Sequence, residues 1–172
     1  MKVSYNWLKN YVDFDLSVKE LAEILTDTGL EVEGIKKIDQ VQGGLDGLVV
    51  GKVTECEKHS DADRLKITQV DVGSESLQIV CGAPNVDVGQ NVIVALVGST
   101  LYPEPDKPFK IKKAKIRGVS SFGMICAEDE MGLGKSHDGI LILDNHARIG
   151  QKASEYFNLS SDYQLEIGLT PN

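Results

Sequence analysis

The sequence predicts an α+β protein with an all-β insertion, in which a small split α+β domain carries an inserted barrel. Three observations support this fold class. Residues 1–40 have the pattern of helix and then strand, residues 48–143 contain short β-type runs, and the chain after residue 148 again has the pattern of helix and strand. Neither flank is long enough to bury a core alone. We therefore expect residues 1–40 and 148–172 to form one domain and residues 41–147 to form the other.

The first flank predicts two helices. A short one is expected over residues 6–12, with Trp7 and Leu8 facing inward. The second begins after Ser17, which stands three residues before Glu20 and so has the spacing of a capping box. Apolar residues then recur at helical spacing, which predicts one buried face.

Strands and turns complete both flanks. Residues 30–38 mix apolar and charged side chains and predict a strand, and residues 42–47, with three glycines, predict a linker. Beyond Gly150, residues 152–157 predict a short helix, and residues 163–167 alternate as a strand does.

Residues 48–143 differ in pattern from the flanks. Gly, Asp, Asn and Pro interrupt them at close intervals, which is typical of a small sandwich or barrel. At roughly 95 residues, a five-stranded barrel with additional hairpins fits this segment. The predicted strands are 48–53, 65–72, 77–80, 92–97, 109–116, 123–126 and 140–143.

Positive charge is concentrated in one segment of an acidic chain. The formal net charge is −8, yet the stretch from Lys107 to Arg117, the basic segment, contains six basic residues and no acidic one. Because the net field of the chain would repel polyanions, such an island must act locally and from one face. The predicted partner is therefore a nucleic acid whose phosphate backbone binds at that face.

Alternation along the basic segment separates two faces of a predicted strand. Phe109, Ile111 and Ile116 are expected to point inward, with the basic side chains on the outer face. Barrels of the oligonucleotide-binding (OB) type bind nucleic acid on a strand face of this kind. An alternative is a solvated edge strand whose lysines only prevent aggregation. The predicted phosphate contacts are Lys110, Lys112, Lys115 and Arg117, with Arg64 and Lys66 of an earlier strand extending the patch.

Two other patterns do not predict a catalytic or metal site. Gly134-Lys135-Ser136 lacks the first glycine of a phosphate-binding loop, since position 129 is an aspartate. His59, Asp61 and Asp63 fit a tight turn before a strand better than a metal site, because no second ligand cluster accompanies them.

The three cysteines lie far apart, without a C-x-x-C pair, and Cys81 and Cys126 fall in apolar runs. Such residues are typical of inert thiols in a reducing compartment. The sequence also contains no signal peptide and no apolar run long enough to cross a membrane. We therefore expect a cytoplasmic protein with no membrane partner, no catalytic residue and no bound metal.

Three ordered blocks of sequence resemble one known module. They run from His59 to Leu65, from Ile79 to Asn85 and from Lys115 to Met124. Each is similar to part of the tRNA-binding OB-fold domain. That domain occurs in free-standing tRNA-binding proteins, in methionyl-tRNA synthetases and in the beta subunit of bacterial phenylalanyl-tRNA synthetase.

The flanks resemble the opening of the phenylalanyl-tRNA synthetase beta subunit. The similarity lies in Met1 to Val12, Thr28 to Glu33 and Ile167 to Asn172. In that family, aminoacylation with ATP and Mg²⁺ belongs to the alpha subunit, and the editing site lies further along the beta subunit. The resemblance therefore implies an α2β2 enzyme of which this chain is a fragment, non-catalytic alone and without a cofactor of its own.

These observations lead to one function and one alternative. The leading hypothesis is a non-catalytic tRNA-binding and assembly region of the beta subunit, in which Ser121 and Met124 line the recognition turn and Asn85 is a hydrogen-bonding neighbour. We expect recognition by shape and charge, because Phe109 and Phe122 are expected in the core and no row of exposed aromatics remains for stacking. The alternative is a protein-interaction module for subunit assembly without tRNA contact, which exposed apolar surface would favour.

Overall fold

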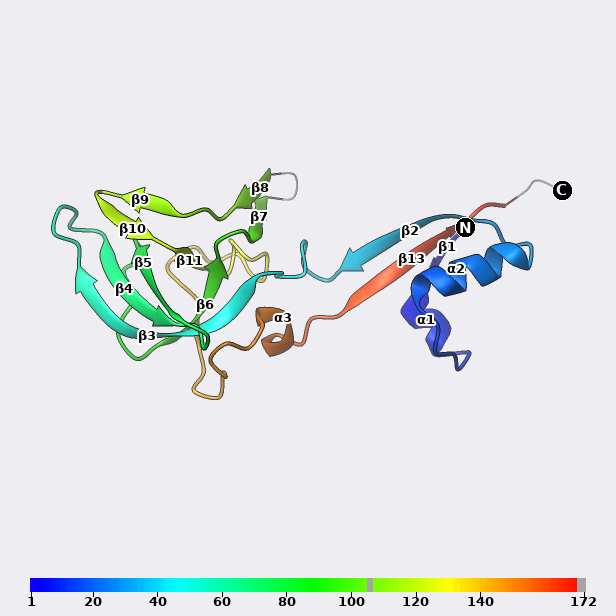
Figure 1. The fold of residues 1–172 in the computed structure, drawn as a ribbon, viewed down its shortest axis with the longest axis horizontal. Coiled ribbons are helices and arrows are strands. Elements are labelled where there is room, and N and C mark those ends of the chain that lie inside the picture. The colour runs from blue at the N-terminus through cyan, green and yellow to red at the C-terminus, as the bar shows by residue number, and fades with distance from the viewer. Residues whose placement is uncertain (105–106, 170–172) are drawn as a thin grey trace. The chain divides into compact units, whose positions relative to one another are not determined.

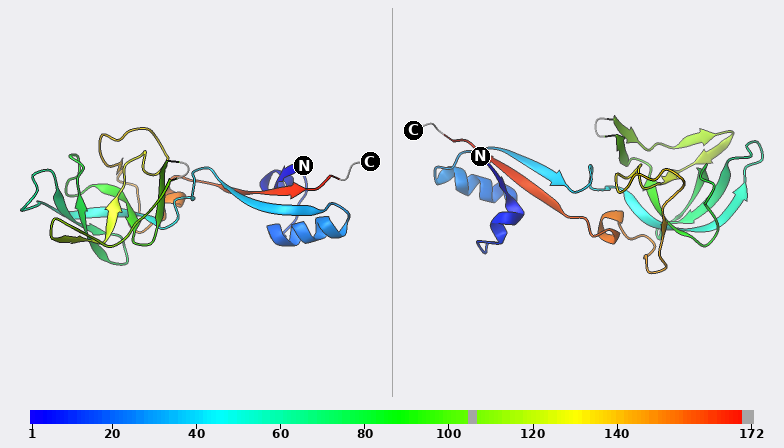
Figure 2. Two further views of the ribbon diagram at one scale, coloured as in Figure 1. Left: turned by 90° about the horizontal axis from the view of Figure 1, so that it is seen from above. Right: turned by 180° about the vertical axis from the view of Figure 1, so that it is seen from behind.

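The computed structural model describes residues 1–104 and 107–169, whose contacts divide into two units. Unit 1 comprises Met1–Gln40 together with the residues from Ser160 onward, and unit 2 comprises Val41–Leu159. The structure is mostly β with few helices (Figures 1 and 2). Within the described ranges no helix combines the length and the apolar character that crossing a bilayer requires.

Unit 1 contains a three-stranded antiparallel sheet and two helices. Its elements are β1 (Lys2–Ser4), α1 (Tyr5–Lys9), α2 (Val18–Asp27), β2 (Val32–Asp39) and β13 (Ser161–Ile167). β13 lies between β1 and β2, so that Leu165 has Val3 opposite it on one side and Ile35 on the other. The wholly buried Leu165 packs with Leu21 and Ala22 of α2. The sheet of unit 1 is therefore complete only when both flanks of the chain are present.

Both helices of unit 1 begin at a serine. The Ser17 hydroxyl accepts a hydrogen bond from the Glu20 N–H, and the Glu20 carboxylate accepts one from the Ser17 N–H, so the predicted capping box is confirmed. α1 is shorter than the predicted helix over 6–12. Leu8 packs against the core, but the prediction that Trp7 faces inward is wrong: its ring is 52% exposed and lies against Tyr11.

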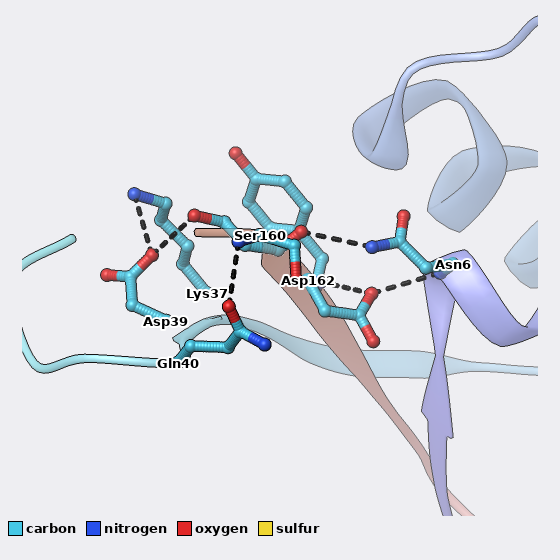
Figure 3. A network of polar contacts seen from close by, with 8 residues as sticks. Asn6, Lys37, Asp39, Gln40, Ser160 and Asp162 are labelled. Atoms are coloured by element: carbon cyan, nitrogen blue, oxygen red, sulfur yellow. Dashed lines mark hydrogen bonds and ion pairs between the residues drawn. The ribbon is translucent and has the colours of Figure 1, made fainter. Parts of the chain in front are cut away.

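A polar network ties the last strand of unit 1 to its first elements (Figure 3). The Asp162 carboxylate accepts hydrogen bonds from the Ser4 hydroxyl at 2.6 Å and from the Asn6 N–H at 3.0 Å. It therefore satisfies an amide in the first turn of α1 that has no partner within the helix. On β2, Asp39 accepts a hydrogen bond from the Ser161 hydroxyl at 2.7 Å.

Hydrogen bonding lowers the pKa of both network carboxyls. For Asp39 the largest cause is the bond from the Ser161 hydroxyl. For Asp162, partial burial acts to raise the pKa, but the bonds from Ser4, Asn6 and Tyr163 outweigh it and the pKa is lowered. Both carboxylates therefore stabilise unit 1 in their ionised forms.

The main sheet of unit 2 curves until its two ends nearly meet. Its strands are β3 (Leu48–Lys58), β4 (Lys66–Asp71), β5 (Ser76–Cys81), β6 (Asn91–Leu96), β11 (Gly123–Ile125) and β12 (Ile142–Leu143), in the order β11-β6-β3-β4-β5 with β12 also paired to β6. The segment before β11 reaches β5 at the other end of this order. The Phe122 N–H donates to the Gln78 carbonyl at 2.9 Å, and the Gln78 amide donates to the Ser120 carbonyl at 2.7 Å. The sheet is therefore barrel-like and nearly closed, as predicted for the inserted segment.

Apolar residues of unit 2 pack on both faces of this sheet. Along β6, Val94 belongs to one buried cluster and Ile93 to the other, because successive side chains point to opposite faces. Helix α3 (Ala153–Tyr156) joins the cluster of Ile93 through the wholly buried Ala153. Residues 148–159 therefore stay with unit 2, and the chain returns to unit 1 at Ser160 instead of at the expected residue 148.

Two hairpin ribbons carry the basic segment outside the main sheet. β7 (Thr100–Glu104) pairs with β8 (Lys107–Lys110), and β9 (Ala114–Ile116) pairs with β10 (Val119–Ser121). The predicted continuous strand over 109–116 is thus interrupted. Ile111 is the cause, because its side chain is buried in the core, its N–H donates to the Ser99 carbonyl and its carbonyl accepts from the Gly98 N–H. β7 and β10 were not predicted.

Candidate nucleic-acid interface

The predicted phosphate contacts lie on the two ribbons of unit 2. The side chains of Lys110, Lys112, Lys115 and Arg117 are all exposed. The ribbons can be followed in Figure 1, where β8 and β9 succeed each other along the chain. These four cations are therefore accessible to a ligand in solution, and their contact with phosphates stays a prediction.

A tight turn places Arg117 at the tip of the second ribbon. Ile116 pairs with Val119, which leaves Arg117 and Gly118 as a two-residue loop with φ of +46° and +90°. Positive φ at both positions is typical of the type I′ turn, whose twist matches that of the flanking strands. The two strands of this ribbon are therefore joined by a tight turn at Arg117 and Gly118.

Phe109 is not in the core, contrary to the prediction. Its side chain is 53% exposed, whereas Ile111 is buried and Ile116 is half-buried. The alternation fails because β8 pairs with β7 in a ribbon of its own, so the face that carries Phe109 is not covered by the main sheet. Phe122 does pack against the core, and the Lys113 ammonium lies 4.6 Å from the centre of its ring.

Ser121 and Met124 lie beside the basic ribbon. Ser121 is buried, and its hydroxyl accepts a hydrogen bond from the Val80 N–H and donates one to the Gly123 carbonyl, both at 3.1 Å. It therefore joins the second ribbon to β5. Met124 is half-buried on β11, where its side chain can shape the adjoining surface.

The Asn85 side chain is committed to the backbone of Ile140. Its amide nitrogen donates to the Ile140 carbonyl at 2.9 Å, and its amide oxygen accepts from the Ile140 N–H at 3.0 Å. A Cβ atom on Gly139 would come within 2.2 Å of that oxygen, so the neighbouring position requires a glycine. The arrangement makes Asn85 a clamp between two loops, and it leaves little of the amide for a ligand.

The two cations expected to extend the basic patch differ in their surroundings. The Lys66 ammonium donates to the Val86 carbonyl at 2.6 Å, which holds it against the backbone of unit 2. Arg64 is exposed in the turn that precedes β4. Any extension of the patch therefore depends on Arg64.

A groove of about 430 Å³ adjoins the basic segment. Its lining includes Phe109 and Lys112 of that segment, Ser121 and Met124, and the end of β5 with the residues after it, from Val80 to Pro84. The sequence indicated several of these residues but not the groove. The groove forms where residues 80–84 meet several segments between residues 109 and 140, and no local sequence pattern indicates that meeting.

His59 organises a turn through a contact that the sequence did not indicate. Its side chain is 5% exposed, and its Nδ1 accepts a hydrogen bond from the Asp61 N–H at 3.0 Å. The Leu65 N–H closes the same turn on the Ala62 carbonyl. The predicted tight turn is therefore confirmed, although the imidazole of His59 holds it instead of an aspartate side chain.

Neither metal binding nor thiol chemistry is indicated by the described residues. Within them, no three His, Cys, Asp or Glu side chains come together in a way that would hold a metal ion. Burial raises the pKa of the Cys126, Cys81 and Cys56 thiols. All three are free cysteines that stay protonated at neutral pH, and a protonated thiol is a poor nucleophile.

Comparison with known proteins gives a matching family and close relatives. The family described as "Putative tRNA binding domain" matches residues 48–152, which form most of unit 2. The "Phenylalanine--tRNA ligase beta subunit" of Bacteroides fragilis is 54% identical over 173 residues, which cover 100% of this chain and 21% of that protein. The protein of the same description from Salinibacter ruber is 50% identical over 183 residues, covering 100% of this chain and 22% of that protein.

The chain spans about a fifth of the length of the curated relatives that it matches. Among solved structures, a MetRS related protein from Pyrococcus horikoshii superposes with a TM-score of 0.46 and 22% identity, over 62% of this chain and 87% of that chain. A likeness of this strength carries no statement about function.

Proposed function

The chain belongs to the family of putative tRNA binding domains, and from that premise we propose that it is the tRNA-binding and assembly region of a phenylalanine–tRNA ligase beta subunit. Unit 2 is then an OB-fold barrel inserted into a split α+β domain, and it binds tRNA without catalysing a reaction. The alpha subunit and the remainder of the beta subunit complete an α2β2 enzyme that aminoacylates tRNA(Phe). The three free cysteines suit the reducing cytoplasm in which that enzyme would work.

The observation that carries this proposal is the exposed basic segment within the matched family region. Lys110, Lys112, Lys115 and Arg117 all fall inside residues 48–152, and all four are exposed. Cations held on rigid ribbons can neutralise phosphates and release their counterions, which gives affinity without base reading. The overall charge of −8 restricts such binding to this face.

ATP and Mg²⁺ are implied for the parent enzyme, and no observation on the described residues of this chain assigns either group to it. Mg²⁺ is held by carboxylates together with substrate phosphates. The described residues bring no three carboxylate, imidazole or thiol side chains together as a metal site. We therefore assign ATP and Mg²⁺ to the rest of the enzyme and derive no step through either group.

Salt dependence of tRNA binding tests the proposal. We expect the chain to bind both tRNA(Phe) and one unrelated tRNA, with a log–log slope of affinity against salt of roughly −3 to −5 if four to six phosphates are contacted. The double variant Lys115→Ala, Arg117→Ala should reduce that slope by about 1.5, because two phosphate contacts are lost.

Two exposed lysines of unit 1 supply the matched control. Lys19→Ala, Lys36→Ala removes the same charge from the chain but lies outside the family match. An equal change of slope in both double variants would show that only net charge matters. A salt slope that is unchanged in Lys115→Ala, Arg117→Ala would show that these two residues do not contact phosphates.

Exposed apolar surface on unit 1 favours an assembly role as a second function. Of the fourteen large hydrophobic side chains that are exposed among the described residues, nine belong to unit 1, although unit 1 is much the smaller unit. The rings of Trp7 and Tyr11, with centroids 4.6 Å apart, form one exposed apolar surface of the kind found at protein interfaces. The nine are Met1, Trp7, Tyr11, Val12, Ile24, Leu30, Ile35, Ile38 and Leu169.

Substitution of the most exposed aromatics tests this role. The double variant Trp7→Ser, Tyr11→Ser in the complete beta subunit should weaken its association with the alpha subunit at least tenfold. Truncating an aromatic side chain that dominates an interface costs about 2 kcal/mol or more of binding free energy. Sedimentation of the mixed subunits measures the assembly. Val97→Ser, at an exposed apolar position of unit 2, is the control and should leave assembly unchanged. Full assembly of the aromatic double variant would exclude this face as an interface.

A further inference from the structure

The groove beside the basic segment is lined mainly by apolar residues. Ile111, Ile116, Met124 and Ile140 are among the residues that line it. Lys112 also lines it, in a segment that carries six cations and no acidic residue. A volume of about 430 Å³ is in the range of small-molecule sites, which are mostly apolar with a few polar groups. The occupant should therefore be flat or apolar in part and carry negative charge nearby.

Phe109 distinguishes this groove from the other apolar surface of unit 2. The other exposed large hydrophobics of unit 2 among the described residues are aliphatic: Val88, Val97, Ile142 and Ile149. Phe109 is 53% exposed and lines the groove, with the exposed Lys110 next to it on β8. An aromatic ring that is open to solvent, in a groove that Lys112 also lines, offers a stacking surface together with a cation for phosphate.

The lining of the groove also includes polar side chains. His137 and Glu130 both line it. The His137 Nδ1 lies 2.8 Å from an Asp129 carboxylate oxygen, and the Glu130 carboxylate accepts a hydrogen bond from the Ala127 N–H at 2.7 Å. Both side chains are thereby oriented, with one ring nitrogen and one carboxylate oxygen remaining. A nucleobase has this combination of an apolar face and a hydrogen-bonding edge, whereas an aliphatic peptide side chain has no such edge.

We propose that the groove takes one unpaired nucleobase of the bound RNA, stacked on Phe109, while an adjoining phosphate contacts Lys112. This inference rests on the proposed RNA binding by unit 2 and adds a base contact to the phosphate contacts. Single-stranded regions of RNA present unstacked bases that aromatic side chains can take up. The proposal adds one base contact to the recognition by shape and charge that the sequence predicts.

A tryptophan placed at position 109 reports directly on stacking. Trp7 is the chain's single tryptophan, so the variant Trp7→Phe, Phe109→Trp has its only indole at the groove. A short single-stranded oligoadenylate should quench this fluorescence on binding. Inorganic polyphosphate, which has phosphates and no bases, should displace labelled tRNA without quenching. Equal quenching by both probes, or by neither while both bind, would overturn the base contact.

Affinity measurements separate this inference from the proposed function. Phe109→Ala should weaken oligoadenylate binding roughly 5- to 100-fold, the range for loss of one stacked base, and leave the salt slope unchanged. Phe109→Trp should retain the affinity, and Val97→Ala is the matched control outside the groove. Unchanged affinity of Phe109→Ala with a normal salt slope would reject the groove and keep the phosphate-binding ribbon. A wild-type chain that binds neither tRNA, oligoadenylate nor polyphosphate would reject both.

Discussion

The two units of the chain differ in how they use apolar side chains. In unit 2, residues such as Val50, Ile93 and Val94 are wholly buried on the two faces of one curved sheet. In unit 1 the buried apolar cluster centres on Leu21, Ala22 and Leu165, and much of the remaining apolar surface is exposed. A nearly closed barrel completes its own core, whereas a three-stranded sheet with two short helices covers itself only in part.

This difference suggests a division of labour. Unit 2 presents charge to solvent on ribbons that stand on a finished core, which suits a polyanion that comes and goes. Unit 1 presents apolar side chains that gain free energy when a second protein surface covers them, at about 25 cal/mol per Å². We infer that the RNA-facing and protein-facing surfaces of the chain belong to different units.

The largest expected effect is a loss of stability in the core of unit 2 that unit 1 does not share. Ile93→Ala should lower the free energy of unfolding of unit 2 by about 2–5 kcal/mol, because it leaves a cavity at a wholly buried position. Far-UV circular dichroism in urea should report the loss. Trp7 fluorescence, which senses unit 1, should keep its transition. A common shift of both signals would mean that the units unfold together.

A smaller effect is expected at the Asn85 clamp. Gly139→Ala should destabilise unit 2 by about 1–3 kcal/mol, because the added Cβ displaces an amide that pairs with the Ile140 backbone. The same dichroism measurement applies. Asn85→Ala should cost a similar amount, and the double variant should cost less than the sum, since both changes break one interaction. Additive costs would show that the two residues act independently.

The smallest expected effect is a loss of stability of unit 1 at acidic pH. The pKa values of Asp162 and Asp39 are lowered on folding, so their stabilisation is present above the unfolded value of about 3.9 and is lost as the pH falls through the folded values. Trp7 fluorescence in urea should therefore show unit 1 weakening below about pH 4. Asp162→Asn should reduce stability at pH 7 by about 1 kcal/mol and flatten this acid dependence. Asp15→Asn, at an exposed position of the same unit, should change neither.

Local chemistry explains which parts of the fold could be predicted from the sequence. The capping box at Ser17 depends on two residues three positions apart, and it is confirmed. The strands of the barrel were predicted because turn residues separate short apolar runs. The ends of the strands differ from the prediction where pairing with a distant strand sets their length. For example, β3 extends to Lys58 because it pairs with β4.

Errors arose where coverage by distant segments decides the outcome. Phe109 and Trp7 have the composition of core residues, but no segment of the described chain covers either ring fully. Ile111 is buried as expected, but hydrogen bonds between its backbone and the turn at Gly98 and Ser99 interrupt the predicted strand there. Similarly, the amide of Asn85 is taken up by Ile140, a contact that no sequence spacing indicates.

The central position of β13 in its sheet has a consequence for how the chain is made. β1 and β2 emerge early during synthesis, yet the strand that lies between them follows only after all of unit 2. At typical translation rates the interval is on the order of ten seconds, long enough for many small β domains to fold. Until then β1 and β2 have no partner strand between them, so the sheet of unit 1 can form only after the inserted barrel has been fully synthesised.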